Sequence, residues 1–215
     1  MMVPGGWIGP GDDDPLPLAL HRPSVGTCRD DVGECGAARD EEETVAEGAD
    51  SIAESLKEII GKPTGSSRVV VERGPVSLFA AAVKSTSPVY RNLEAARAAG
   101  FDAIPAPPTW PFAMEFAGHF EEIQPEGAQP PNPLGTIMGL LMANGGLILH
   151  GEQEFLYHRP VQVGDVLVSE GRIADAYQKE SKGRVMTFIV SETNWSDDTT
   201  GAPVVTTRFN LIHRA

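Results

Sequence analysis

The chain has 215 residues, of which 41% are hydrophobic and 22% are charged, and this composition is typical of one globular domain. Its formal net charge is −13, but residues 1–50 hold twelve Asp/Glu against three Lys/Arg and account for −9 of it, which leaves −4 for the rest. Neither part carries the basic stripe of a nucleic-acid-binding protein, so we expect no nucleic-acid partner.

Residues 1–50 are predicted to form a disordered acidic arm, because Gly, Pro and acidic residues dominate and no hydrophobic period lasts beyond a turn. A partner-docking arm is the alternative. Both cysteines, Cys28 and Cys35, lie there at a spacing that matches no metal pattern. The rest of the chain lacks cysteine, which favours a reducing compartment. No secretion signal or membrane-spanning run is visible, so we expect a cytoplasmic protein without membrane contact.

A globular domain is predicted over residues 51–215, and it starts with a helix. Ser51-Ile52-Ala53-Glu54 is a capping-box pattern, and the apolar stripe that follows it ends at Gly61. Residues 68–72, with the sequence RVVVE, are β-branched and predict a strand. Gly74-Pro75 then starts a second helix, which Pro88 and the residues before it interrupt.

A Pro-rich elbow, residues 105–110, follows a small Ala-rich helix over residues 93–99. Its prolines predict a rigid, extended entry into a third, apolar helix that Thr109 can cap. Phe112, Ala113 and Phe116 are predicted to share one face of that helix. Two short helices, a stiff elbow and a buried helix therefore precede the strands.

The last third of the chain predicts long strands. Residues 121–135 indicate a loop and residues 135–144 a short helix. The four strands expected after them are joined by short turns, which favours an antiparallel sheet wrapped around the buried helix. They span residues 146–157, 165–179, 184–195 and 204–213.

This order of residues resembles the hot-dog fold of the MaoC-type acyl-thioester dehydratases and hydratases, and most closely their FAS1-like dehydratase N-terminal branch. The resemblance covers residues 55–213 and implies an α+β hot-dog fold with an antiparallel sheet around a central α-helix. It is carried by residues 79–80, 87–90, 95–101, 105–110 (PAPPTW), 149–155 (LHGEQEF), 157–161 (YHRPV) and 164–165.

The resemblance also locates where catalysis would occur. In the family, a G-D-x-N-P-x-H run supplies an Asp and a His, and the start of the central helix donates N–H groups to the thioester oxygen. Here Pro88 aligns, but Ser85 stands at the Asp position and Tyr90 at the His position. Neither is a good base at neutral pH without an activating neighbour. Pro108-Thr109 replaces His-Gly at the elbow, where Pro108 cannot donate.

Other residues are candidates for catalysis or substrate binding. His150 and Glu152 are predicted to share a strand face and could form a rival acid–base pair, although such residues more often lie at a sheet edge or an interface. No third ligand lies near them, so we expect no metal site. The substrate-binding candidates are Tyr90, Pro108, Thr109, Trp110, Ala113 and Phe116. Trp110 and Phe116 could equally be plain core.

The resemblance thus implies the substrate-holding half of a two-part dehydratase or enoyl hydratase, as in actinobacterial (3R)-hydroxyacyl-ACP dehydratases and heteromeric hydratases of steroid side-chain breakdown. The substrate would be an acyl thioester on CoA or ACP, with no cofactor. We expect a homodimer, or a heterodimer with a catalytic MaoC-like subunit. The alternatives are a self-sufficient hydratase that uses His150 and Glu152, and a non-enzymatic acyl-thioester binding module.

Overall fold

The structure, a computed structural model, describes residues 52–126, 130–143, 145–181 and 183–214. The predicted acidic arm, residues 1–50, lies outside the described residues, as does Ser51 of the predicted capping box. Within the described ranges, no helix combines the length and apolar character needed to cross a membrane.

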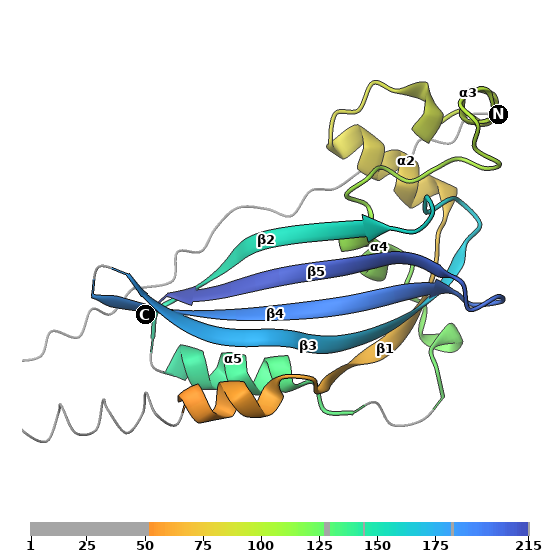
Figure 1. Ribbon diagram of the computed structural model, residues 1–215. Helices are drawn as coiled ribbons and strands as arrows, with labels where there is room; N and C mark the ends of the chain where they lie inside the picture. The colour runs from red at the N-terminus through yellow and green to blue at the C-terminus, as the bar shows by residue number, and fades with distance from the viewer. Residues whose placement is uncertain (1–51, 127–129, 144, 182, 215) are drawn as a thin grey trace, which may run out of the picture. The chain divides into compact units, whose positions relative to one another are not determined.

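Five antiparallel strands form one sheet in the order β1-β3-β4-β5-β2 (Figure 1). The predicted antiparallel sheet is confirmed, and each of its four long strands lies within a few residues of the predicted range. The first strand begins earlier than predicted, because Pro63 to Val70 all run along β3. The strands are β1 (Pro63–Val70), β2 (Leu147–Tyr157), β3 (Val166–Ser181), β4 (Arg184–Asp197) and β5 (Pro203–Arg214).

The helices match the predicted order. Residues 52–59 are helical. The small Ala-rich helix begins where the Asn92 side chain accepts a hydrogen bond from the Ala95 N–H at 2.9 Å, and Gly100 follows it with a φ of +90°. The labelled helices are α2 (Arg73–Ala82), the Ala-rich α3 (Leu93–Ala98), α4 (Pro111–Ala117) and α5 (Pro133–Ala143), with 3₁₀ turns at η1 (Pro88–Tyr90) and η2 (Glu121–Ile123).

Two hydrophobic clusters lie on one face of the sheet, which we call the inner face. Trp195 and Ile189 point to this face from β4, because they are six residues apart and side chains alternate along a strand. Trp195 packs in the cluster that contains Met114 of α4, and Ile189 packs in the cluster that contains Ile137 of α5. In Figure 1, α5 and the orange helix of residues 52–59 lie along the sheet. The opposite, outer face carries the charged side chains of Arg172, Glu192 and Arg208.

α4 buries a different side from the one predicted. Trp110 and Met114 are 2% and 1% exposed, whereas Phe112 is 49% and Phe116 is 84% exposed. Positions 110, 113, 114 and 117 form the stripe that faces the sheet, and residues 112 and 116 lie to its side. The expectation that Phe112 and Phe116 belong to a buried helical face was therefore wrong. Thr109 does not cap the helix, since the N-cap is Trp110 and no side chain bonds there.

Candidate functional site

The elbow, residues 105–110, is anchored by the chain that follows β2. The Ala106 N–H donates to the Val161 carbonyl at 2.8 Å, and Pro105 pairs with Gln162 in an antiparallel bridge. At the other end, the Trp110 N–H donates to the Pro107 carbonyl at 2.9 Å and closes a β-turn. The elbow is thus fixed by tertiary contacts as well as by its prolines.

The elbow presents one free backbone donor. The Trp110 N–H is already bonded to the Pro107 carbonyl. Pro108 and Pro111 have no N–H. The Thr109 N–H has no acceptor among the described residues, and Thr109 is exposed. A ligand oxygen can therefore reach this N–H, whereas the Trp110 N–H is not available to it.

Tyr157, at the end of β2, reaches the elbow from the inner face. Its hydroxyl donates to the Pro108 carbonyl at 2.8 Å. Burial, and secondarily the nearby Tyr90, raise the pKa of the Tyr157 phenol well above its usual range. The structure therefore brings two phenols, Tyr90 and Tyr157, together at the elbow.

No role for Tyr157 was predicted from the sequence, where it stands only within the YHRPV motif of the resemblance. Its position at the end of a strand, with only His158 between it and the Arg159-Pro160 break, was the available signal. That signal could not identify Pro108 as its partner, because the two residues are 49 positions apart in the chain.

Ser85 and Tyr90, which occupy the family's Asp and His positions, lie on the loop between α2 and α3. The Ser85 hydroxyl accepts a hydrogen bond from the Ser87 N–H at 3.4 Å, and its carbonyl accepts one from Arg91 at 2.9 Å. In the described part of the chain, no carboxylate or imidazole bonds to either Ser85 or Tyr90. Neither side chain is therefore set up as a general base.

His150 and Glu152 lie on opposite faces of the sheet, so the prediction that they share a face was wrong. The register of β2 on β5 shifts between them, with His150 opposite Leu211 and Glu152 opposite Asn210. A β-bulge adds one residue, Gly151, and reverses the alternation of side chains. His150 packs on the inner face between the rings of Phe112 and Phe209, at centroid distances of 5.2 and 4.6 Å.

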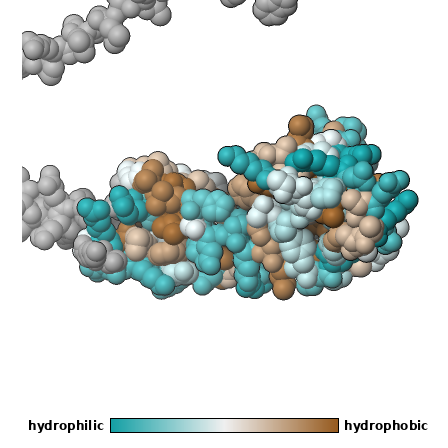
Figure 2. All heavy atoms as spheres, turned by 90° about the horizontal axis from the view of Figure 1, so that it is seen from above, coloured by the Kyte–Doolittle hydropathy of each residue, from teal (hydrophilic) through white to brown (hydrophobic). Residues whose placement is uncertain are grey.

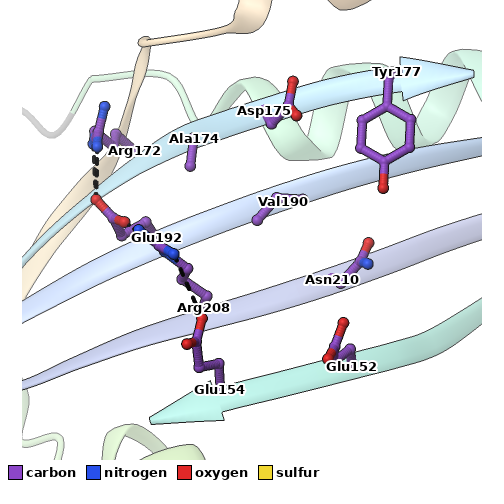
Figure 3. A pocket seen from close by; sticks show the side chains of 10 residues that line it. All are labelled: Glu152, Glu154, Arg172, Ala174, Asp175, Tyr177, Val190, Glu192, Arg208 and Asn210. Atoms are coloured by element: carbon purple, nitrogen blue, oxygen red, sulfur yellow. Dashed lines mark hydrogen bonds and ion pairs between the residues drawn. The ribbon is translucent and has the colours of Figure 1, made fainter. Parts of the chain in front are cut away.

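Glu152 instead lines a hollow of about 550 Å³ on the outer face (Figure 3). A ladder of ion pairs crosses four strands there. Glu192, whose side chain is 7% exposed, accepts from Arg172 at 2.7 Å and from Arg208 at 2.8 Å, and Arg208 also lies 3.5 Å from Glu154. Hydrogen bonds from Arg208 and Arg172 lower the pKa of Glu192. The ladder satisfies its own charges, which fits a structural role.

The remaining candidates divide between the core and the surface. Trp110 is buried edge-to-face on Phe79, with ring centroids 5.4 Å apart, and Ala113 packs against the same cluster. Phe116 lies exposed. Tyr90, Pro108 and Thr109 are thus the predicted binding residues that the structure gathers at the elbow. No group of three potential metal ligands occurs among the described residues.

Comparison with known proteins places the chain among dehydratase-like sequences. Residues 58–207 match the family described as "FAS1-like, dehydratase domain region". A UPF0336 protein of Saccharopolyspora erythraea is 31% identical over 144 residues, which are 67% of this chain and 81% of that protein. A UPF0336 protein of Mycobacterium tuberculosis is 29% identical over 166 residues, 77% of this chain and 89% of that protein.

Two solved complexes from Mycobacterium tuberculosis share the fold. The HadBC (3R-hydroxyacyl-ACP dehydratase) complex aligns with a TM-score of 0.52 and 23% identity, over 72% of this chain and 96% of the matched chain. The ChsH1-ChsH2 complex aligns with a TM-score of 0.55 and 22% identity, over 80% of this chain and 91% of the matched chain. At these identities the similarity shows the fold alone.

Proposed function

Since the chain belongs to the family of FAS1-like dehydratase domains and has a hot-dog fold, we propose that it is the substrate-holding subunit of a hydro-lyase that acts on acyl thioesters. The thioester would be carried by CoA or ACP. The observation that carries the proposal is the elbow, which keeps one exposed N–H donor at Thr109 while Ser85 and Tyr90 occupy the catalytic positions.

In this proposal the chain binds the thioester oxygen and the partner performs the proton transfers. Removing the α-proton and protonating the β-hydroxyl require a base and an acid with pKa values near neutrality. Tyr157 remains protonated and Ser85 is not activated, so a partner with an intact Asp/His run would supply both groups. The proposal is supported by the two structural neighbours, which are complexes of two different subunits.

A self-sufficient hydratase built on His150 and Glu152 is not supported, because the bulge at Gly151 points their side chains to opposite faces. An acyl-thioester binding module without catalysis shares the same elbow and is the alternative outcome of the test. We further propose a cytoplasmic location, which fits the absence of cysteine from residues 51–215 and can be checked by cell fractionation.

The decisive experiment is co-expression of the chain with MaoC-like candidate subunits that carry an intact D-x-N-P-x-H run. Hydration of crotonyl and longer enoyl thioesters, on CoA and on ACP, is then measured for the chain alone, the partner alone and the complex. We expect turnover only in the complex. Thioester binding without turnover in any combination would favour the binding module. Full activity of the chain alone would contradict the proposal.

A further inference from the structure

The proposed function assigns no role to the hydrogen bond between Tyr157 and Pro108. We infer that Tyr157 is a positioning residue, which aims the Thr109 N–H at the thioester oxygen by holding the Pro108 carbonyl. This inference rests on the proposed function, because it takes the thioester oxygen as the ligand of that N–H. Both backbone groups in this role, the Pro108 carbonyl and the Thr109 N–H, lie in the turn before α4 and not in the helix itself.

The geometry of one peptide unit links the two groups. The Pro108 carbonyl and the Thr109 N–H belong to the same planar trans peptide, so they point in opposite directions. The Tyr157 hydroxyl bonds that carbonyl at 2.8 Å from the inner face. Fixing the carbonyl therefore fixes the direction of the N–H, which faces away from Tyr157.

The other constraints in the turn do not fix the orientation of the Pro108–Thr109 peptide, so that orientation depends on Tyr157. The Trp110 N–H is held by the Pro107 carbonyl, and proline rings fix φ at positions 107 and 108. The rotations on either side of the Pro108–Thr109 peptide, ψ of Pro108 and φ of Thr109, are fixed by neither proline ring. Among the described residues, the Tyr157 hydroxyl is the only group bonded to that peptide unit.

Tyr157 is itself held firmly. It pairs with Val205 in the sheet and packs against the α4 cluster. The next residues are tied down as well, because the Arg159 guanidinium bonds Asp165 at 2.7 Å and Asp197 at 3.1 Å. The backbone that carries the Tyr157 phenol is thus held rigidly, as accurate positioning requires.

The protonation state of Tyr157 suits this role. A positioning donor must keep its proton, and burial raises the pKa of this phenol above the usual value for tyrosine. The hydrogen bond to Pro108 consequently persists through neutral and moderately alkaline pH. Titration of Tyr157 should therefore cause no change in thioester affinity over that pH range.

The test uses the full chain, alone and with its co-expressed partner, and crotonyl-pantetheine labelled with ¹³C at the thioester carbonyl. Infrared difference spectra report hydrogen bonding to that carbonyl as a lowered stretching frequency. We expect Tyr157→Phe to reduce the shift seen on binding by at least half and to weaken binding about two- to tenfold, the usual effect of one hydrogen bond. Tyr177→Phe is the matched control, because Tyr177 stacks on Phe188 on the outer face and should leave both values unchanged.

A second measurement keeps the inference testable if Tyr157→Phe does not fold. In the wild-type chain, the Thr109 amide proton should move downfield when crotonyl-pantetheine is added. Binding without movement of that amide, or an unchanged carbonyl shift in a folded Tyr157→Phe chain, would overturn the inference and leave the proposed function intact. If the wild type binds no thioester in either form, the proposed function fails and the inference fails with it.

Discussion

At the scale of single residues, the elbow offers hydrogen-bond donors and no base. Thr109 presents a free N–H, and Tyr157 is a phenol whose pKa is raised by burial. Tyr90 adds a second phenol beside it, while the Ser85 hydroxyl is bonded only to the neighbouring backbone. Such a set can orient and polarise a carbonyl, but it cannot remove an α-proton near neutral pH.

The replacement of the family's Asp and His by Ser85 and Tyr90 gives the first prediction. The purified chain alone should hydrate crotonyl thioester at background rate, because a positioned acid–base group typically contributes ~10²–10⁴-fold. Tyr90→His alone should leave the rate there, since no carboxylate stands at position 85. The double change Ser85→Asp with Tyr90→His should raise it, provided that Thr109 still donates. Turnover by the unmodified chain that His150→Ala abolishes would contradict the prediction.

A second prediction concerns the buried carboxylate of the outer-face ladder. Glu192→Gln should lower the free energy of unfolding by about 1–3 kcal/mol at neutral pH, because Arg172 and Arg208 lose their charged acceptor. The pKa of Glu192 is depressed in the fold, so its contribution is present above the unfolded-state pKa. It is lost as pH falls through the lower folded-state pKa.

Urea unfolding at neutral and at acid pH measures both effects. The difference between wild type and Glu192→Gln should shrink as the pH falls. Glu154→Gln is the control, because that side chain is 62% exposed and its 3.5 Å ion pair should contribute less than about 1 kcal/mol. Equal losses of unfolding free energy in the two variants would contradict the prediction that the buried position of Glu192 between two guanidinium groups makes it the more stabilising carboxylate.

At the scale of elements, two glycines allow close approaches of α4 and β2 to their neighbours. α4 ends at Gly118, whose carbonyl accepts the Val70 N–H at 3.0 Å and so ties the helix to β1. In β2, Gly151 occupies the bulge that separates His150 from Glu152. A side chain at either glycine would collide with a neighbour, so each element depends on a residue without a Cβ.

A third prediction tests the junction of α4 with β1. A Cβ at residue 118 would overlap the Val70 carbonyl oxygen, so Gly118→Ala should destabilise the fold by about 1–3 kcal/mol through overpacking. Gly139→Ala in α5 is the matched control, because a methyl group added there would meet nothing within 4 Å and alanine favours helix. It should stabilise the fold by about 0.5–1 kcal/mol. Thermal melts compare the two, and equal melting temperatures would refute the steric explanation.

At the scale of the described molecule, the two inner-face clusters leave β2 only partly buried, since each of its residues is exposed or half-buried. β2 ends the strand order and has its second neighbour position unpaired among the described strands. Phe112 and Phe116 of α4 are exposed, and Phe112 lies against His150 of β2. Figure 2 shows brown hydrophobic atoms in separate patches between teal ones on the surface seen from above Figure 1. An apolar surface beside a free strand edge favours association.

The fourth prediction is therefore a dimeric assembly, homomeric or with a catalytic partner. Phe116→Asp should weaken association, because Phe116 is 84% exposed and a carboxylate there would be buried on assembly. Leu78→Asp on α2, at a position that is 72% exposed, is the control and should leave association unchanged. Sedimentation velocity measures both variants, and a stable wild-type monomer, alone and with candidate partners, would exclude this assembly.

The sequence alone determined the antiparallel sheet, the order of the short helices and the rigid elbow. These features follow from local rules: short turns between the expected strands, Gly74-Pro75 at a helix start, and the fixed φ of Pro105 and its neighbours. Each rule acts over a few residues, so the printed chain contains the information needed. The substitutions at Ser85 and Tyr90 were likewise readable, since they concern which side chain is present and not where it points.

Only the tertiary structure decided which groups at the elbow are free and which residues meet there. The bulge at Gly151 reversed the faces of β2, and α4 turned Phe116 to the surface, because long-range packing overrode the local pattern. The pairing of Tyr157 with Pro108 spans 49 residues and has no local signature. A hydrogen bond between distant segments exists only once the sheet has brought them together, and the chemistry of this site depends on that bond.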